Sequence, residues 1–382
     1  MFDAIIQCQL PDLFDDGVDS VLDLLQGEVG ASGISVPVAV PPMAYLRRSR
    51  TDAPRVARSR GGLYFHADDG RYSQTRLRPI TADWLKGRDP LDQAAERCRS
   101  RGLALWLEVS TTLTGRVATR YPEAATKSVY DDRSPIRLCP VNPDVAEWLR
   151  ALVADVSQRF SPTALILSDL HTGRRESGVC DVSNGLAGGG GAAELLAICF
   201  CESCRQVAAR AGVDTEAAAR AVRTHLDEAL AGPARLDKRL GLFVESLDGP
   251  PFLREYLDAQ RAAVEHVLHE AVRACAVPLI LHRYSDEIWP VRTGGLPSAS
   301  GLVQMRDVDL EAATTELSRG AADCIRLELS DCARLQPPAL VRTLTESAER
   351  GVRSVELIHY GTATRADLHI AKQAIRFARR SA

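Results

Sequence analysis

Three cysteines in the middle of the chain, Cys199, Cys201 and Cys204, form the pattern C-x-C-x-x-C. Three thiolates at this spacing can reach one metal ion from a tight turn, and zinc in a closed structural site takes a fourth ligand. The candidates for that ligand are Cys139 and Cys180. We favour Cys139, because it lies directly before a predicted helix start. The sequence therefore predicts a structural zinc site. An iron–sulfur cluster is a weaker interpretation, because the C-x3-C-x2-C spacing is absent, and three buried thiols without a metal are the other alternative.

Two acidic residues, Asp169 and Glu328, lie at the carboxyl ends of predicted strands. Residues at this end of a parallel barrel are the ones that serve catalysis. A pair of carboxylates is the usual machinery for cleaving a glycosidic bond, since one acts as acid and the other as nucleophile or base. We therefore predict Asp169 and Glu328 as catalytic residues.

Strand alternation indicates which other side chains face the inside of the sheet. In the strand Asp323–Leu329, the residues Ile325 and Leu327 form an apolar side, so Arg326 and Glu328 should face inwards. In the fourth strand, Asp169 should face inwards together with His171. The same reasoning in the other strands predicts a substrate-binding set that comprises Trp106, Glu108, His171, His282, Tyr284, Glu356 and Tyr360. In this scheme Trp106 or Trp289 stacks on a sugar ring. The alternative is that Arg326 forms buried ion pairs with Glu328 or Glu356 that only satisfy one another.

The elements that position these residues are short apolar runs alternating with helical patterns, which is typical of βα units and a parallel sheet. Eight strands are predicted, over Ala4–Gln9, Gly33–Val40, Leu103–Val109, Ala164–Asp169, Val277–His282, Gly301–Met305, Asp323–Leu329 and Ser354–Tyr360. They predict an α/β protein with a single (β/α)8 TIM barrel over residues 1–382, with insertions at about 41–90 and 171–250. An open doubly wound sheet is disfavoured, because no Gly-x-Gly-x-x-Gly follows the first strand.

The clearest predicted helix begins after Asn142, which suits an N-cap and is followed by proline at the first helical position. Apolar residues then recur at helical spacing as far as Phe160. Further helices are predicted over Val18–Gly27, Glu216–Ala231, Pro251–Ala274 and Thr364–Arg379.

The composition and net charge of the chain limit the classes of function that it could have. The 382 residues have 45% hydrophobic and 25% charged residues and a net charge of −3. This charge disfavours a nucleic-acid-binding protein. We expect no membrane partner, because no apolar stretch approaches the ~18 residues of a membrane helix. The start lacks the pattern of a signal peptide, so we expect a cytoplasmic protein whose cysteines are reduced or bound to metal.

Several of these segments together resemble a known group of proteins. Leu138-Cys-Pro-Val-Asn-Pro-Asp-Val145, the strand Leu165–Asp169 and the cysteine motif Cys199-Phe-Cys-Glu-Ser-Cys204 resemble glycoside-hydrolase-like TIM barrels, mostly uncharacterised and often from alanine-rich bacterial proteins. Gly62-Leu-Tyr-Phe65 and Ala95–Leu103 are similar to the same group. The resemblance covers about residues 60–210.

The cysteines are also similar to those of family-42 β-galactosidases. That similarity implies Cys139, Cys199, Cys201 and Cys204 as zinc ligands. It further implies an acid/base at the end of strand four and a nucleophile at the end of strand seven, where Asp169 and Glu328 stand. The Asn-Glu pair typical of strand four in that clan is replaced by Ser168-Asp169, so a role for Asp169 as nucleophile stays open.

The leading hypothesis is thus a retaining glycosidase that acts on a small carbohydrate or glycoside. A metal-dependent sugar lyase or isomerase, with His171 and His282 as metal ligands, is one alternative. A non-catalytic carbohydrate-binding barrel is another. The sequence leaves the sugar, the linkage and homo-oligomer formation open.

Overall fold

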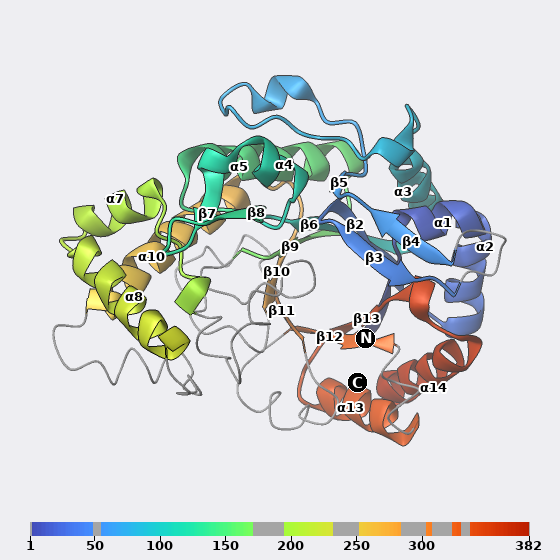
Figure 1. The fold of residues 1–382 in the computed structure, drawn as a ribbon. Coiled ribbons are helices and arrows are strands. Elements are labelled where there is room, and N and C mark those ends of the chain that lie inside the picture. Colours follow the sequence, from blue (N-terminus) through green and yellow to red (C-terminus); the bar gives the residue numbers. More distant parts are fainter. Residues whose placement is uncertain are drawn as a thin grey trace.

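A computed structural model describes residues 2–48, 55–170, 195–231, 252–283, 303–307, 323–329 and 337–381 (Figure 1). Eight parallel strands form its main sheet. These are β1 (Asp3–Gln7), β2 (Gly33–Val40), β6 (Ala104–Ser110), β9 (Ala164–Ser168), β10 (Leu279–Arg283), β11 (Val303–Asp307), β12 (Cys324–Glu328) and β13 (Ser354–Ile358).

The strand order is β1-β13-β12-β11-β10-β9-β6-β2, and β1 pairs in parallel with β2 as well. The predicted α/β class is therefore confirmed, and the structure shows a curled parallel sheet. The segments that follow β10 and β11 lie outside the described residues, so the full eightfold repeat of strand and helix stays a prediction.

Most helices lie around the outside of the sheet, and α7 and α8 pack against α10 farther out (Figure 1). They are α1 (Leu10–Asp16), α2 (Val18–Leu22), α3 (Pro90–Ser100), α4 (Arg116–Arg120), α5 (Pro143–Phe160), α7 (Glu202–Arg210), α8 (Thr215–Ala231), α10 (Phe252–Ala274), α13 (Pro337–Glu349) and α14 (Arg365–Ser381). A π-helical turn, Asp23–Val29, continues α2, so the helix predicted over Val18–Gly27 is a composite of two helix types. No helix among the described residues has both the length and the apolar character to cross a membrane.

Helix α5 begins where its sequence signals place it. The Asn142 side chain accepts a hydrogen bond from the backbone N–H of Asp144 at 3.0 Å, and Pro143 occupies the first turn, where no N–H is needed. The helix then buries Trp148, Leu152 and Phe160 against the sheet, as the spacing predicts.

The segment between β2 and α3 forms a separate two-stranded sheet and adds one short strand to the main sheet. β3 (Met43–Leu46) and β4 (Val56–Ser59) pair as an antiparallel hairpin, and β5 (Gly62–Leu63) pairs with the end of β2. Short helical turns follow over Asp69–Tyr72 and Asp83–Leu85.

Two apolar clusters identify the two faces of the sheet. The large one fills the space between strands and helices. The small one lies on the opposite, inward face and comprises Ile5, Trp106, Ala164, Ile166, Ile280 and Cys324. The small cluster thereby fixes, strand by strand, which side chains point inwards.

Candidate functional site

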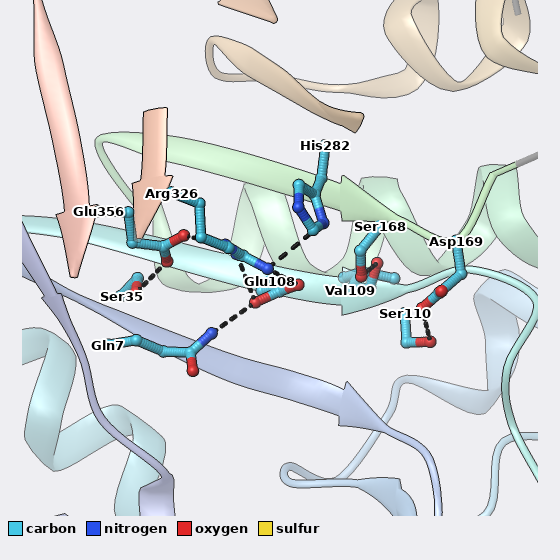
Figure 2. A network of polar contacts seen from close by, with 10 residues as sticks. All are labelled: Gln7, Ser35, Glu108, Val109, Ser110, Ser168, Asp169, His282, Arg326 and Glu356. Atoms are coloured by element: carbon cyan, nitrogen blue, oxygen red, sulfur yellow. Dashed lines mark hydrogen bonds and ion pairs between the residues drawn. The ribbon is translucent and has the colours of Figure 1, made fainter. Parts of the chain in front are cut away.

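A polar layer follows the inner apolar cluster toward the carboxyl ends of the strands. Gln7, Glu108, His282 and Arg326 each come two residues after a member of that cluster, and side chains two apart in a strand share a face. Together with Ser35 and Glu356 they form one buried network (Figure 2).

Arg326 is the centre of this network. Its two terminal nitrogens donate to Glu108 Oε1 and Oε2 at 3.2 and 3.0 Å, and its Nε donates to Glu356 Oε2 at 2.5 Å. Gln7 Nε2 donates to Glu108 Oε2 at 2.9 Å, and Ser35 Oγ bonds Glu356 Oε1. The planar guanidinium thus bridges two carboxylates that the chain separates by 248 residues, from Glu108 to Glu356.

Two carboxylates and one guanidinium carry one excess negative charge if all three are ionised. Glu356 is fully buried. Burial raises the pKa of its carboxyl above the usual value, Arg326 opposes this, and the nearby Glu108 adds to it. Both carboxyl oxygens of Glu356 nevertheless accept hydrogen bonds, from Arg326 and from Ser35. The alternative given above, that Arg326 mainly satisfies buried acids, fits its contacts with Glu108 and Glu356.

His282 belongs to the same layer. Its Nδ1 lies 3.3 Å from Arg326 Nη1.

Asp169 stands apart from this network, past the end of β9 (Figure 2). Its carboxyl Oδ2 accepts a hydrogen bond from Ser110 Oγ at 2.8 Å, and its carbonyl oxygen accepts one from Thr112 Oγ1 at 2.7 Å. The side chain is 5% exposed, and the backbone has φ of 62°. A non-glycine residue keeps this left-handed conformation only where its surroundings hold it.

Alternation along β9 differs from the prediction. Ser168 shares the inward face with Ala164 and Ile166, and Asp169 is the next residue along. The direction of the Asp169 side chain is therefore set by the turn after the strand, where the backbone is left-handed.

The remaining predicted site residues that the structure describes lie outside the network around Arg326. Glu328 ends β12, two residues after Arg326, and its side chain is exposed. Trp106 lies in the inner apolar cluster, so a role in stacking on sugar is not supported. Tyr360 lies in a 3-10 turn after β13, belongs to the large core and donates to Asp16 Oδ2 at 3.0 Å, so it does not face inwards as predicted. His171, Tyr284, Trp289 and Cys180 lie outside the described residues.

The four cysteines Cys139, Cys199, Cys201 and Cys204 meet in one buried cluster. Their sulfur atoms all lie within 4.8 Å of one another. A backbone donor, the N–H of Lys127, points at Cys199 Sγ at 3.4 Å. Four converging sulfurs and a backbone donor to one of them fit a metal held by thiolates, as in a structural zinc site.

The cluster is itself supported by the core. The Cys199 carbonyl accepts hydrogen bonds from Tyr256 Oη at 2.9 Å and Gln260 Nε2 at 2.6 Å, both on α10. The rings of Phe200 and Tyr256 stack, with their centroids 4.9 Å apart. These contacts hold the cysteine motif against α10, and none of them involves a metal ion.

A second group of titratable residues surrounds the ends of β1 and β13, and no motif pointed to it. Arg47 Nε lies 2.6 Å from Asp12 Oδ1, and Tyr45 Oη donates to the same oxygen at 2.9 Å. Burial raises the pKa of Asp12 to about 6 and lowers that of His359 to about 4. Its members come from separate elements, with Asp12 in α1 and Tyr45 in β3, so no pattern in the sequence joins them.

Comparisons with known proteins give a likeness of fold. No family model matches the chain, and no curated protein matches it in sequence. Among solved structures, it is similar to a β-galactosidase from the psychrophilic Marinomonas ef1, with a TM-score of 0.53 and 10% identity over 98% of this chain and 59% of that one. It is also similar to α-L-fucosidase isoenzyme 2 from Paenibacillus thiaminolyticus, with a TM-score of 0.51 and 12% identity over 99% of this chain and 49% of that one.

The likeness is one of fold alone. The chain spans between about half and three fifths of the length of these two glycosidases. The α/β architecture with a curled sheet is therefore shared with glycoside hydrolases.

Proposed function

We propose that this protein is a retaining glycoside hydrolase that acts on a small carbohydrate or glycoside. The observation that carries the proposal is the buried carboxylate of Asp169 at the carboxyl end of a central strand, which accepts a hydrogen bond from Ser110, while Thr112 holds the backbone carbonyl of the same residue. The two glycosidases that share the fold support the same class of reaction. We further propose that the strands and helices complete a (β/α)8 barrel.

In this proposal Asp169 and Glu328 flank the glycosidic bond. Asp169 follows β9 and Glu328 ends β12, so both lie at the edge of the sheet where barrel enzymes place their catalytic groups. The exposure of Glu328 suits a group that meets substrate. Glu108, His282 and Glu356 form the floor beneath them, linked through Arg326, with His171 and Tyr284 as further substrate-binding candidates.

The zinc proposal concerns structure and not the reaction. Cys139, Cys199, Cys201 and Cys204 would hold the ion, whose four strong bonds would tie together the segments that precede α5 and α7. A site closed by four thiolates leaves no position for substrate or water.

A screen with nitrophenyl glycosides tests the proposal, beginning with β-galactosides and α-L-fucosides. We expect Asp169→Asn and Glu328→Gln each to lower turnover by about 10³-fold, the range seen when an acid/base group is lost. Glu96→Gln, an exposed acid on α3, is the matched control and should keep full activity. Near-wild-type turnover in both site variants would refute the assignment of this pair.

A further inference from the structure

The hairpin of β3 and β4 has two different faces. Side chains alternate along a strand, so every second residue shares a face. The residues of one face are buried or half-buried: Met43, Tyr45, Arg47, Ala57 and Ser59. The residues of the other face, with the next residue past each strand that continues the alternation, are all exposed: Ala44, Leu46, Arg48, Val56, Arg58 and Arg60. We call this second set the outer face of the hairpin.

An apolar pair occupies the middle of the outer face. Leu46 and Val56 are register partners in the two strands, and they are 63% and 44% exposed. Among the described residues, the other large hydrophobic side chain with such exposure is Phe377, which lies on α14. Because apolar surface in contact with water is unfavourable, a partner that covers this pair gains free energy.

Arginines flank the apolar pair on both sides. Arg58 and Arg60 follow Val56 along one strand, and Arg48 lies at the opposite end of the outer face. The ion pair of Arg60 with Asp83, at 3.9 Å, is exposed to water and therefore weak. The described part of the hairpin has five arginines and no acidic residue, although the whole chain has a net charge of −3. Same-face positions are about 7 Å apart along a strand, so the outer face is about 20 Å long.

Buried contacts hold the hairpin at the carboxyl ends of β1 and β13 (Figure 1). Arg47 Nε lies 2.6 Å from Asp12 Oδ1 of α1, the helix that follows β1. The backbone N–H of Arg48 donates to the carbonyl oxygen of Gly361, just after β13, at 2.7 Å. Glu328 is in register with the last residue of β13. The hairpin therefore lies at the edge of the sheet that carries the candidate catalytic residues.

We propose that the outer face binds an extended acidic oligosaccharide that continues into the candidate active site, so that the substrate is an acidic glycan. The statement about substrate rests on the proposed glycosidase function, whereas the statement about binding does not. Guanidinium groups bind carboxylates and sulfates through paired, charge-assisted hydrogen bonds. The apolar pair between them covers the C–H face of a sugar ring. Cations at both ends of a stripe about 20 Å long suit a chain of charges better than one small anion.

Other occupants fit the outer face less well. Single-stranded nucleic acid is held by aromatic side chains that stack on bases, and the outer face has none. A second copy of the chain, placed on the same face by a two-fold axis, would bring arginine opposite arginine. Binding to nucleic acid, to an anionic membrane or to a second copy is therefore an outcome that would overturn the proposal.

Calorimetric titration of the full chain tests the binding, with a galacturonic acid tetramer and a heparin tetrasaccharide as probes. We expect at least one probe to bind, and salt to weaken it. The uncharged methyl ester of the galacturonic acid tetramer should not bind measurably. Arg58→Gln with Arg60→Gln should raise Kd about 10-fold or more, because both charge-assisted contacts are lost. Arg376→Gln with Arg380→Gln removes the same charge from exposed positions on α14 and should leave Kd unchanged.

Three results would overturn the proposal. The first is that neither acidic probe binds. The second is that both double variants weaken binding equally. The third is that a thymidine oligonucleotide, or vesicles of phosphatidylcholine and phosphatidylglycerol, bind as tightly as the acidic sugars, or that Arg58→Gln with Arg60→Gln dissolves a dimer.

Turnover separates this inference from the proposed function. Asp169→Asn should bind the acidic probes as wild type does, so binding without any turnover would leave the outer face supported and refute the glycosidase. Turnover of neutral glycosides without binding of the acidic probes would do the reverse. If both hold, Arg58→Gln with Arg60→Gln should raise KM on an acidic oligosaccharide about 10-fold and leave kcat unchanged. The same variant should keep wild-type KM on a nitrophenyl glycoside, which is too short to reach the hairpin.

Discussion

Leu138 donates its backbone N–H to the carbonyl oxygen of Thr112 at 2.8 Å. The two residues connect the two notable features of the molecule. Leu138 directly precedes Cys139 of the cysteine cluster, and the Thr112 hydroxyl donates to the Asp169 carbonyl. The end of β8 (Arg133–Leu138) thereby links the candidate metal site to Asp169 through two hydrogen bonds. The first joins Leu138 to Thr112, and the second joins Thr112 to Asp169.

The first prediction concerns metal. Purified protein should hold about one zinc ion per chain by elemental analysis, and Cys204→Ser should lose it. Because a bound structural metal contributes folding free energy, the variant's Tm should fall by on the order of 5–10 °C. Cys275→Ser removes a thiol outside the cluster and should keep both metal and Tm. Equal metal content in wild type and Cys204→Ser would contradict the site.

The second prediction follows the path from Thr112 to Asp169. Thr112→Val keeps the volume of the side chain but removes the hydroxyl, so the free energy of unfolding should fall by about 1 kcal/mol. Glycosidase turnover should fall as well, because the turn that carries Asp169 loses a contact. Thr112→Ser keeps the hydroxyl and should restore both quantities. Urea unfolding and kinetics on the same preparations decide the matter, and an active, fully stable Thr112→Val would show that this bond is dispensable.

The third prediction concerns Arg326. Arg326→Met leaves Glu108 and Glu356 buried without their cation, so the free energy of unfolding should fall by about 3–5 kcal/mol. Glu356→Gln alone should cost less than Arg326→Met, since it keeps one acceptor oxygen, and burial raises the pKa of the Glu356 carboxyl. The triple variant with Glu108→Gln and Glu356→Gln should recover most of the loss from Arg326→Met. Chemical denaturation measures all three, and failure of the triple variant to recover would argue against charge as the cause.

The fourth prediction concerns pH and His359. Burial holds the pKa of this histidine near 4, below its ordinary 6.5, and Arg47 adds to the effect. The folded state therefore resists protonation. The contribution of neutral His359 to the free energy of unfolding is fully present above pH 6.5. It is lost as the pH falls toward 4, by at most about 3 kcal/mol.

An asparagine can accept the Gly361 N–H as His359 Nδ1 does at 3.1 Å, and it does not titrate. His359→Asn should thus show a shallower loss of stability between pH 6.5 and 4 than wild type. The raised pKa of Asp12 acts in the opposite direction, because that group binds its proton more readily when folded, between pH 6 and 4. Its contribution is common to both proteins and cancels in the comparison. Parallel pH curves for the two proteins would rule out His359 as the source.

Local patterns were sufficient for much of the fold. The bounds of β2 agree with the predicted strand, and α5 begins at its asparagine and proline signals. The association of Cys139 with the cysteine motif was also predicted, because Cys139 lies directly before a predicted helix start, and the four thiols do meet in one cluster. These features depend on residues near one another in sequence or on a strong preference of one residue type.

Tertiary structure decided the details of the site. Alternation predicted an inward Asp169, yet Ser168 has that position, because the strand ends and the backbone turns left-handed at Asp169. Alternation also failed for Tyr360, which lies in a turn beyond β13. A period of two holds only while the strand continues, and the sequence does not mark where the ladder stops.

The amino-acid sequence by itself thus determined the α/β class, the parallel strands and the four cysteines that meet in one cluster. Only the tertiary structure decided that Arg326 joins Glu108 to Glu356, and that Ser110 and Thr112 hold Asp169. The physical reason is that hydrophobic periodicity reports which face of an element is buried. Hydrogen bonds between side chains depend instead on distances of a few ångströms between strands far apart in the chain, which periodicity does not encode.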